Sequence, residues 1–422
     1  MNAKKKKFSS IGTLIFVVSI LMTLGGCGSS NKSGGLTLMI WDTFQEPGIR
    51  QMTEIFTEET GISVDVQVVT WNEYWTLLQA GAQGGELPDV FWMHSNEFQR
   101  YADNNMLLDM TDLIANSDLV DLNYFYEDIV ELYNFNGRQY AVPKDVDTIA
   151  LWYNRALFME AGVELPNNNW TWYDLLDAAI QLTDLDAGQY GFAWNVDNAQ
   201  DGWYNLIYSY GGYVISGDRR HSGFDNPNTI EAMRFLQALL EANVMPSLET
   251  LSENGTNVLF ESGMLAMSTF GSWMVQSFAS NDVLLENLGI VMLPTAPNGN
   301  RVSIYNGLGW AASADGSNTD SAWELIEFLG SERMQYMQAD LGITMSALKG
   351  TSNNWVNSVP EFNLQAHLNM LDYIVMFPYS RNTLVWSRMS QELLQSVWLG
   401  QRSMDDVLLE IAEEMNNILA QE

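Results

Sequence analysis

Carboxylate, amide, hydroxyl and imidazole groups follow two apolar runs near the start of the chain, at the points where strands would end. They are Asp42, Thr43, Gln45 and Glu46 after the first run, and His94 and Asn96 after the second. Such groups donate and accept hydrogen bonds, and 12% of the residues are aromatic, with rings that can stack on flat apolar faces. These residue types favour non-covalent binding of a hydroxylated ligand. A competing interpretation is that one polar residue in each set only caps the following helix.

Signatures of covalent or metal chemistry are missing from the sequence. No G-x-S-x-G, Walker A, H-E-x-x-H or G-x-G-x-x-G pattern occurs, and the three histidines are widely spaced. Asp184–Gly188 has the start of a calcium loop, but the twelfth position holds Asn195 instead of Glu, so an ordinary turn is the better interpretation. We expect no enzyme, cofactor or metal. The 52 acidic residues leave a glycosidase carboxylate pair open as an alternative.

The elements around the polar residues alternate between strand and helix. Residues 36–41, 63–69 and 90–93 have strand patterns, and helices are expected at 47–60 and from 71 to about 84. This β-α-β-α-β order predicts a parallel sheet with crossover helices, which places both polar sets at one sheet edge. A second α/β unit begins near Ile149, and the length of the chain favours two domains.

The amino terminus has the pattern of an export signal. Lys4–Lys7 precede the apolar stretch Ile11–Leu24, and Leu24-Gly25-Gly26-Cys27 resembles a lipobox. Cys27 is the only cysteine, so a disulfide framework and a Cys-ligated zinc site are excluded. We therefore predict a signal peptide over residues 1–27, acylation of Cys27, and a flexible tether over 28–35. The chain should be exported and lipid-anchored on the outer face of the cell membrane.

The charge balance is strongly acidic, with 52 acidic against 19 basic residues and a net charge of −33. A body of this charge repels nucleic acid, so no nucleic-acid partner is expected. The simplest interpretation is a solvated acidic coat. A receptor for a cationic solute such as a polyamine is the alternative that would use the acidic loops directly.

Four segments in order resemble the extracellular solute-binding proteins that include maltose-binding protein and its oligosaccharide-binding relatives. They are residues 38–41 with 59–64; Gly85-Glu86-Leu87-Pro88-Asp89-Val90; Gly137–Pro143 followed by Leu151-Trp152-Tyr153-Asn154; and Phe260–Met267 followed by Gly271-Ser272-Trp273. The resemblance implies an α/β fold of two lobes, each a mostly parallel sheet flanked by helices, with chain crossings near 140–147, 303–307 and 342–350. It divides the chain into lobe 1 (36–143 plus 308–345) and lobe 2 (144–307 plus 346–422).

The resemblance also implies a function and further site residues. It predicts a monomeric receptor that binds a carbohydrate between the lobes and passes it to the permease of an ABC importer. Asp147 stands where relatives place an acidic sugar ligand, and Trp273 and Trp386 match stacking positions, although helix packing is a close rival for Trp386. The remaining candidates are Trp71, Trp194, Asn195, Trp203, Asn306 and Arg381. For Trp71, burial in the core is an equal alternative.

Overall fold

The first of the two main sheets is built largely from the amino-terminal part of the chain. The computed structural model describes residues 35–195 and 198–422, so the predicted signal peptide and most of the predicted tether lie outside the described residues. The sheet has the order β2-β1-β3-β12-β6. Its strands are β1 (Leu36–Ile40), β2 (Val64–Val68), β3 (Val90–Met93), β6 (Val142–Pro143) and β12 (Gly309–Ala312).

Local sequence signals account for the first helices. Helix α1 (Glu46–Thr60) has Pro47 in its first turn and ends at Gly61, whose φ of 77° is left-handed. Helix α2 (Trp71–Gly84) begins with a capping box, in which Thr70 and Glu73 bond each other's backbone amides. Because β1 pairs in parallel with both β2 and β3, the β-α-β-α-β prediction is confirmed.

The second main sheet has the order β10-β7-β9-β8. Its strands are β7 (Ile149–Asn154), β8 (Tyr190–Ala193), β9 (Leu265–Gly271) and β10 (Leu288–Val291). The expectation of mostly parallel sheets is confirmed, with one reversed strand in each sheet. In this sheet β7 runs antiparallel to β9 and β10, and in the first sheet β12 runs antiparallel to β3 and β6. Strands that enter a sheet from a distant part of the chain do not have to follow the β-α-β direction rule.

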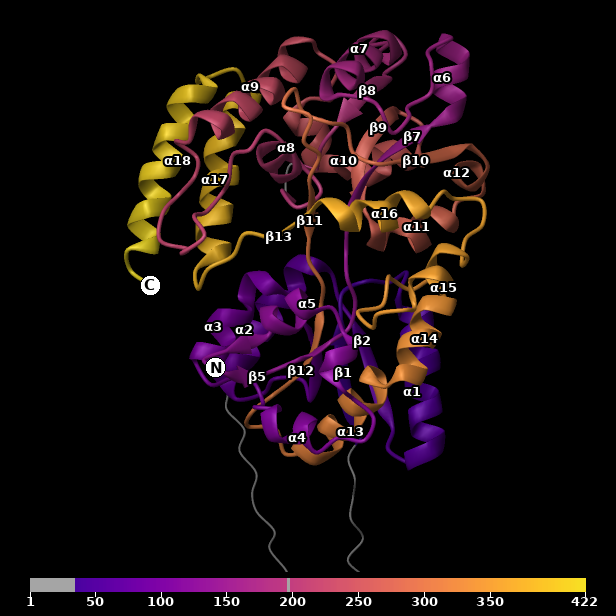
Figure 1. Ribbon diagram of the computed structural model, residues 1–422, viewed down its shortest axis with the longest axis vertical. Helices are drawn as coiled ribbons and strands as arrows, with labels where there is room; N and C mark the ends of the chain where they lie inside the picture. Colours follow the sequence, from indigo (N-terminus) through magenta and orange to yellow (C-terminus); the bar gives the residue numbers. More distant parts are fainter. Residues whose placement is uncertain (1–34, 196–197) are drawn as a thin grey trace, which may run out of the picture. The chain divides into compact units, whose positions relative to one another are not determined.

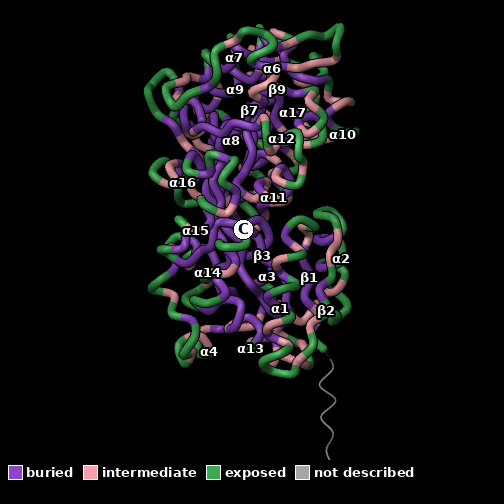
Figure 2. The backbone as a smooth tube through the Cα atoms, turned by 90° about the vertical axis from the view of Figure 1, so that its right-hand side faces the viewer, coloured by how far each residue is buried: buried purple, intermediate pink, exposed green. Residues whose placement is uncertain are grey.

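Each sheet has its own helices, as Figure 1 shows. Helices α1 and α13 (Thr319–Gly330) contact the first sheet, while α7 (Trp172–Leu182), α10 (Leu248–Glu261) and α16 (Gln365–Met370) contact the second. Buried positions, purple in Figure 2, lie inside both sets of elements, and much of the outer backbone is exposed. No helix in the described part of the chain is long and apolar enough to cross a membrane.

The remaining elements are short strands and mostly peripheral helices. They are α3 (Ser95–Asp103), α4 (Thr111–Ala115), η1 (Leu122–Tyr124), α5 (Glu127–Leu132), β4 (Asn134–Phe135), β5 (Arg138–Gln139), α6 (Arg155–Ala161), α8 (Trp203–Ser209), α9 (Pro227–Glu241), η2 (Ser272–Met274), α11 (Val275–Ala279), α12 (Asp282–Asn287), β11 (Ser303–Tyr305), α14 (Glu332–Asp340), α15 (Ser352–Val356), η3 (Leu371–Tyr373), β13 (Ile374–Met376), α17 (Thr383–Trp398) and α18 (Met404–Leu419). The side chains of Asn226 and Ser403 cap the starts of α9 and α18, where they accept the backbone amides of Asn228 and Asp406.

Three chain segments run side by side between the two sheets, as the predicted crossings require. The Lys144 amide donates to the Leu308 carbonyl at 2.7 Å, the Val146 amide to the Met345 carbonyl at 2.9 Å, and the Asp147 amide to the Asn306 carbonyl at 2.7 Å. The segments approach so closely that a Cβ on Gly307 would lie 2.1 Å from the Asp145 carbonyl oxygen. Only glycine fits at that position without moving the backbone.

Candidate functional site

His94 marks the edge of the first sheet where the site is built. It follows β3 and caps α3, and its Nδ1 accepts a hydrogen bond from the Asn96 backbone amide at 3.2 Å. Its ring meets the Trp71 ring edge-on, with centroids 5.5 Å apart. The positions of Trp71 and Asn96 are set by the starts of two helices, because Trp71 is the first residue of α2 and Asn96 lies in the first turn of α3.

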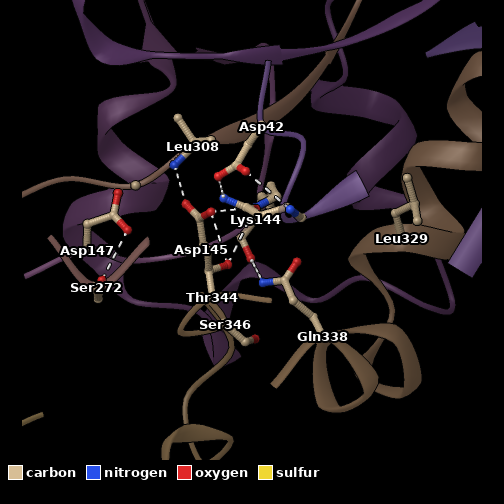
Figure 3. A network of polar contacts seen from close by, with 12 residues as sticks. Asp42, Lys144, Asp145, Asp147, Ser272, Leu308, Leu329, Gln338, Thr344 and Ser346 are labelled. Atoms are coloured by element: carbon tan, nitrogen blue, oxygen red, sulfur yellow. Dashed lines mark hydrogen bonds and ion pairs between the residues drawn. The ribbon is translucent and has the colours of Figure 1, made fainter. Parts of the chain in front are cut away.

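Groups from the crossing segments and from the chain beyond β8 reach the same place. The Asn306 side-chain nitrogen lies 2.9 Å from His94 Nε2 and donates to Gln200 Oε1 at 3.5 Å. Asn306 pairs through its backbone with Asp147, whose Oδ1 accepts from the Ser272 hydroxyl at 3.3 Å (Figure 3). The structure therefore brings five predicted residues together: Trp71, His94, Asn96, Asp147 and Asn306.

Four buried polar atoms around this cluster have no hydrogen-bond partner in the described residues. They are Asn96 Oδ1, Gln200 Nε2, Asp201 Oδ1 and Asn306 Oδ1. All four side chains are at most 7% exposed. Since a buried unpaired polar atom costs on the order of 1–3 kcal/mol, four of them in one region are unfavourable in the ligand-free protein. Acceptors and a donor left in this way suit a ligand that carries hydroxyl groups.

Burial suppresses charge in the cluster. It lowers the pKa of His94 to about 4, against the opposing influence of the neighbouring Asn96 and Gln200 side chains. It also raises the pKa of Asp201 well above its usual range. The pKa of Asp147 is raised by burial first and by the nearby Asp145 carboxylate second. A site whose titratable groups favour their uncharged forms is suited to an uncharged, hydrogen-bonding ligand.

Aromatic rings border the polar cluster. The Trp41 ring contacts Trp71 at 5.0 Å, Tyr74 at 4.8 Å and Trp92 at 4.9 Å between centroids. Trp71 is the most exposed of these rings, at 39%. The Phe377 ring also contacts the His94 ring, with centroids 5.7 Å apart. Trp71 is therefore held by its neighbours while part of its surface stays free to stack.

The predicted set after β1 is only partly free for a ligand. Asp42 is half-buried and accepts from the Phe44 amide at 2.8 Å and from Gln45 Nε2 at 2.8 Å. Gln45 is buried, Thr43 is exposed, and Glu46 pairs with Arg50 at 2.6 Å along α1. The competing helix-cap interpretation does not hold for this set, because α1 has no side-chain cap hydrogen bond. The Asp42 carboxylate instead accepts the backbone amides of Phe44 and Gln45 within the loop.

Three predicted aromatic contacts require correction, because their rings are packed in the interior. Trp194, fully buried, lies between Trp172 and Phe192, at 5.8 and 5.0 Å. Trp203 is 1% exposed and packs on Trp398, at 5.8 Å. Trp386, also fully buried, donates from Nε1 to Ser380 Oγ at 3.0 Å.

The other three candidates have different surroundings. Trp273 is half-buried, and its ring lies over Gly271, where an added Cβ would meet it at 2.1 Å. Arg381 pairs with Asp103 at the end of α3, at 3.4 Å. Asn195 is half-buried and directly precedes residues 196–197, which are outside the described residues.

Gln200 and the adjacent Asp201 belong to the candidate site, and the sequence did not indicate them. They lie in the turn before α8, and the Thr269 hydroxyl of β9 donates to the Asp201 carbonyl. No strand-end or motif signal precedes them. The only available hint was their place shortly after the Trp194–Asn195 stretch, where ligand contacts were expected.

The structure supports no metal centre in the part of the chain that it describes, where no group of three His, Cys, Asp or Glu side chains could hold an ion. Asp184–Gly188 forms a turn in which Asp184 Oδ1 accepts from the amides of Asp186 and Ala187, both at 3.1 Å. This agrees with the turn interpretation of that segment.

The fold has two α/β lobes, and residues near both sheets and on the crossing segments form one polar and aromatic cluster. This arrangement is that of a solute-binding protein. The family model described as bacterial extracellular solute-binding protein matches residues 42–336. The chain belongs to this family.

Individual relatives and solved structures agree with that assignment. The chain is 26% identical over 370 residues to a galactooligosaccharide-binding protein of Bacillus subtilis, covering 83% of each chain. It is 22% identical over 362 residues to a maltooligosaccharide ABC transporter solute-binding lipoprotein of Streptococcus pneumoniae, covering 81% of this chain and 80% of the relative. An ABC substrate-binding protein from Listeria monocytogenes, solved with cycloalternan, has a similar fold, with a TM-score of 0.85, 22% identity and coverage of 92% and 99%.

Proposed function

We propose that this protein is the receptor of an ABC importer, and that it binds a carbohydrate, in particular an oligosaccharide, between its lobes and delivers it to the permease. We assign residues 36–143 and 308–345 to lobe 1, and residues 144–307 and 346–422 to lobe 2. The protein binds its ligand as a monomer and without chemistry. Its relatives include proteins named for binding galactooligosaccharide and maltooligosaccharide.

The observation that carries the proposal is the set of four unpaired buried atoms, on Asn96, Gln200, Asp201 and Asn306. They come from α3, from the turn before α8 and from a crossing segment. A single ligand that bonds all four atoms must therefore contact both lobes. Sugars offer many hydroxyl groups together with flat C–H faces. Trp71 supplies a partly exposed ring for such a face.

Titration calorimetry and thermal melts against a panel of ligands test the proposal. The panel consists of galactooligosaccharides, maltooligosaccharides and the polyamine spermidine. We expect one-to-one binding of an oligosaccharide and a rise in melting temperature, because a ligand that binds only the folded state stabilises it. Spermidine should leave both unchanged. Binding of spermidine alone, or release of reducing ends from the oligosaccharides, would contradict this function.

We propose further that Cys27 is the mature amino-terminal residue and carries the lipid anchor. The supporting features are the lipobox pattern and the relative named as a lipoprotein. Two acyl chains are enough for stable anchoring, so the protein should fractionate with membranes. Cys27→Ala should shift it to the medium or leave it with an uncleaved signal. Mass spectrometry that finds an unmodified terminus beyond residue 27 would disprove the anchor.

A further inference from the structure

Lys144 is a fully buried ammonium group at the point where the three crossing segments meet. All three of its N–H donors have an acceptor within reach, namely Asp145 Oδ2 at 2.5 Å, Gln45 Oε1 at 2.9 Å and Thr344 Oγ1 at 3.4 Å (Figure 3). It also lies 4.6 Å from the centroid of the Trp92 ring. A buried charge is tolerated only with such complete pairing.

The ion pair is not needed to hold the crossing segments together. Their backbones already bond one another, including the bonds of the Lys144 amide to the Leu308 carbonyl and of the Val146 amide to the Met345 carbonyl. Asp145 adds links within the same bundle, because Oδ1 accepts from the Leu308 amide at 2.6 Å and Oδ2 from the Thr344 hydroxyl at 3.2 Å. Replacing a buried ion pair by uncharged side chains of similar volume is often neutral or stabilising, so the two charges do not have to be kept for stability.

What the ammonium group adds is a link to the loop after β1. Gln45 accepts from Lys144 through Oε1 and, through Nε2, donates to Asp42 Oδ2 at 2.8 Å. The other oxygen of Asp42 holds the amides of Phe44 and Gln45. The loop that carries the predicted ligand-binding residues Asp42 and Thr43 is therefore attached to the crossing segments through two side chains.

We propose that Lys144 is a positioning residue, which fixes the Asp42 loop relative to the crossing segments through Gln45. The role of this loop in binding rests on the proposed function, but its attachment does not. In a receptor of this kind the loop on one lobe would keep its place with respect to the hinge when the lobes move.

Hydrogen exchange in the ligand-free protein, followed by mass spectrometry, tests the proposal. The variant Lys144→Met/Asp145→Asn leaves no unpaired buried charge and keeps an acceptor for the Leu308 amide, so it should fold. Exchange at the amides of Phe44 and Gln45 should become at least tenfold faster, while the amides of Val146 and Asp147 keep their protection. Lys349→Met, at an exposed lysine, is the matched control and should change neither.

Gln45→Met separates positioning from general loosening. It should accelerate the same two amides, and the triple variant should exchange no faster than Lys144→Met/Asp145→Asn, because both changes break one chain of contacts. Unchanged exchange in the Lys144 variant, or additive effects in the triple variant, would overturn the proposal. If the Lys144→Met/Asp145→Asn variant does not fold, Gln45→Met alone tests the proposal. Unchanged exchange at the Phe44 and Gln45 amides in Gln45→Met would show that Gln45 does not attach the loop to Lys144. Because no ligand is present, failure here is distinct from failure to bind an oligosaccharide.

Discussion

His367→Gln should make the stability of the protein less sensitive to acid. His367 is fully buried on α16, with Nδ1 3.0 Å from the Thr148 carbonyl oxygen and Nε2 accepting from Trp152 Nε1 at 3.1 Å. This arrangement requires the neutral ring, and burial lowers its pKa to about 3. The unfolded chain binds a proton at a pKa near 6.5, so stability from this group is complete above pH 6.5 and is lost as the pH falls toward 3.

Between pH 7 and pH 5, His367 should lower the free energy of unfolding by about 2 kcal/mol, and His94 should lower it by a similar amount. The reason is that the lowered pKa of each histidine lies below this pH range. Asp147 and Asp201, whose pKa values are raised, act in the opposite direction. The test is therefore a difference: urea unfolding of wild type and His367→Gln at both pH values. The variant should lose about 2 kcal/mol less than wild type. His221→Gln, at an exposed position, is the control. An identical pH dependence in wild type and His367→Gln would show that the ring is not held neutral.

Asp201→Ala should weaken ligand binding without destabilising the ligand-free protein. Asp201 is 4% exposed, Oδ1 has no partner in the described residues, and burial raises its pKa. Removing a buried carboxyl group that has an unpaired oxygen relieves an unfavourable burial, so the melting temperature should stay the same or rise. The group should pair with a ligand hydroxyl when ligand is bound. Its loss should weaken binding by about 0.5–1.5 kcal/mol, the value of a hydrogen bond between uncharged groups, or roughly two- to tenfold.

The matched control for this prediction is Asp177→Ala, at an exposed position on α7. Calorimetric titration with the oligosaccharide that binds wild type, together with thermal melts, gives both readouts. Unchanged affinity in Asp201→Ala would remove Asp201 from the site. A clear fall in melting temperature would show instead that the carboxyl group supports the fold.

Local features of the fold could be predicted from the sequence because their signals are local. The capping boxes at Thr70 and Thr171 and the glycine after α1 each depend on neighbouring residues. Strand direction could not be predicted in the same way. Strand β9 pairs antiparallel with β7 from more than a hundred residues earlier, and no short pattern encodes that partner.

Residues of the candidate site could be predicted where they lie at a strand end or on a crossing segment, as His94, Asp147 and Asn306 do. The tryptophans were harder, because the same ring serves equally well in a core and beside a ligand. Trp194 and Trp386 differ from Trp71 in burial, and burial depends on which distant elements pack over the ring. Gln200 and Asp201 were missed because their place in the site comes from the approach of a crossing segment, which the sequence of their own turn does not express.

The order of strands in the first sheet has a consequence for the way the chain folds. Strand β12 lies between β3 and β6, yet it arrives in the sequence after the whole of the second sheet. During synthesis β3 has an unpaired edge until residue 312 is available, and β6, which pairs only with β12 within the described sheet, has no partner at all. Closing contacts over so long a stretch of chain is entropically slow. The first sheet therefore cannot reach its final form until residue 312 has been synthesised.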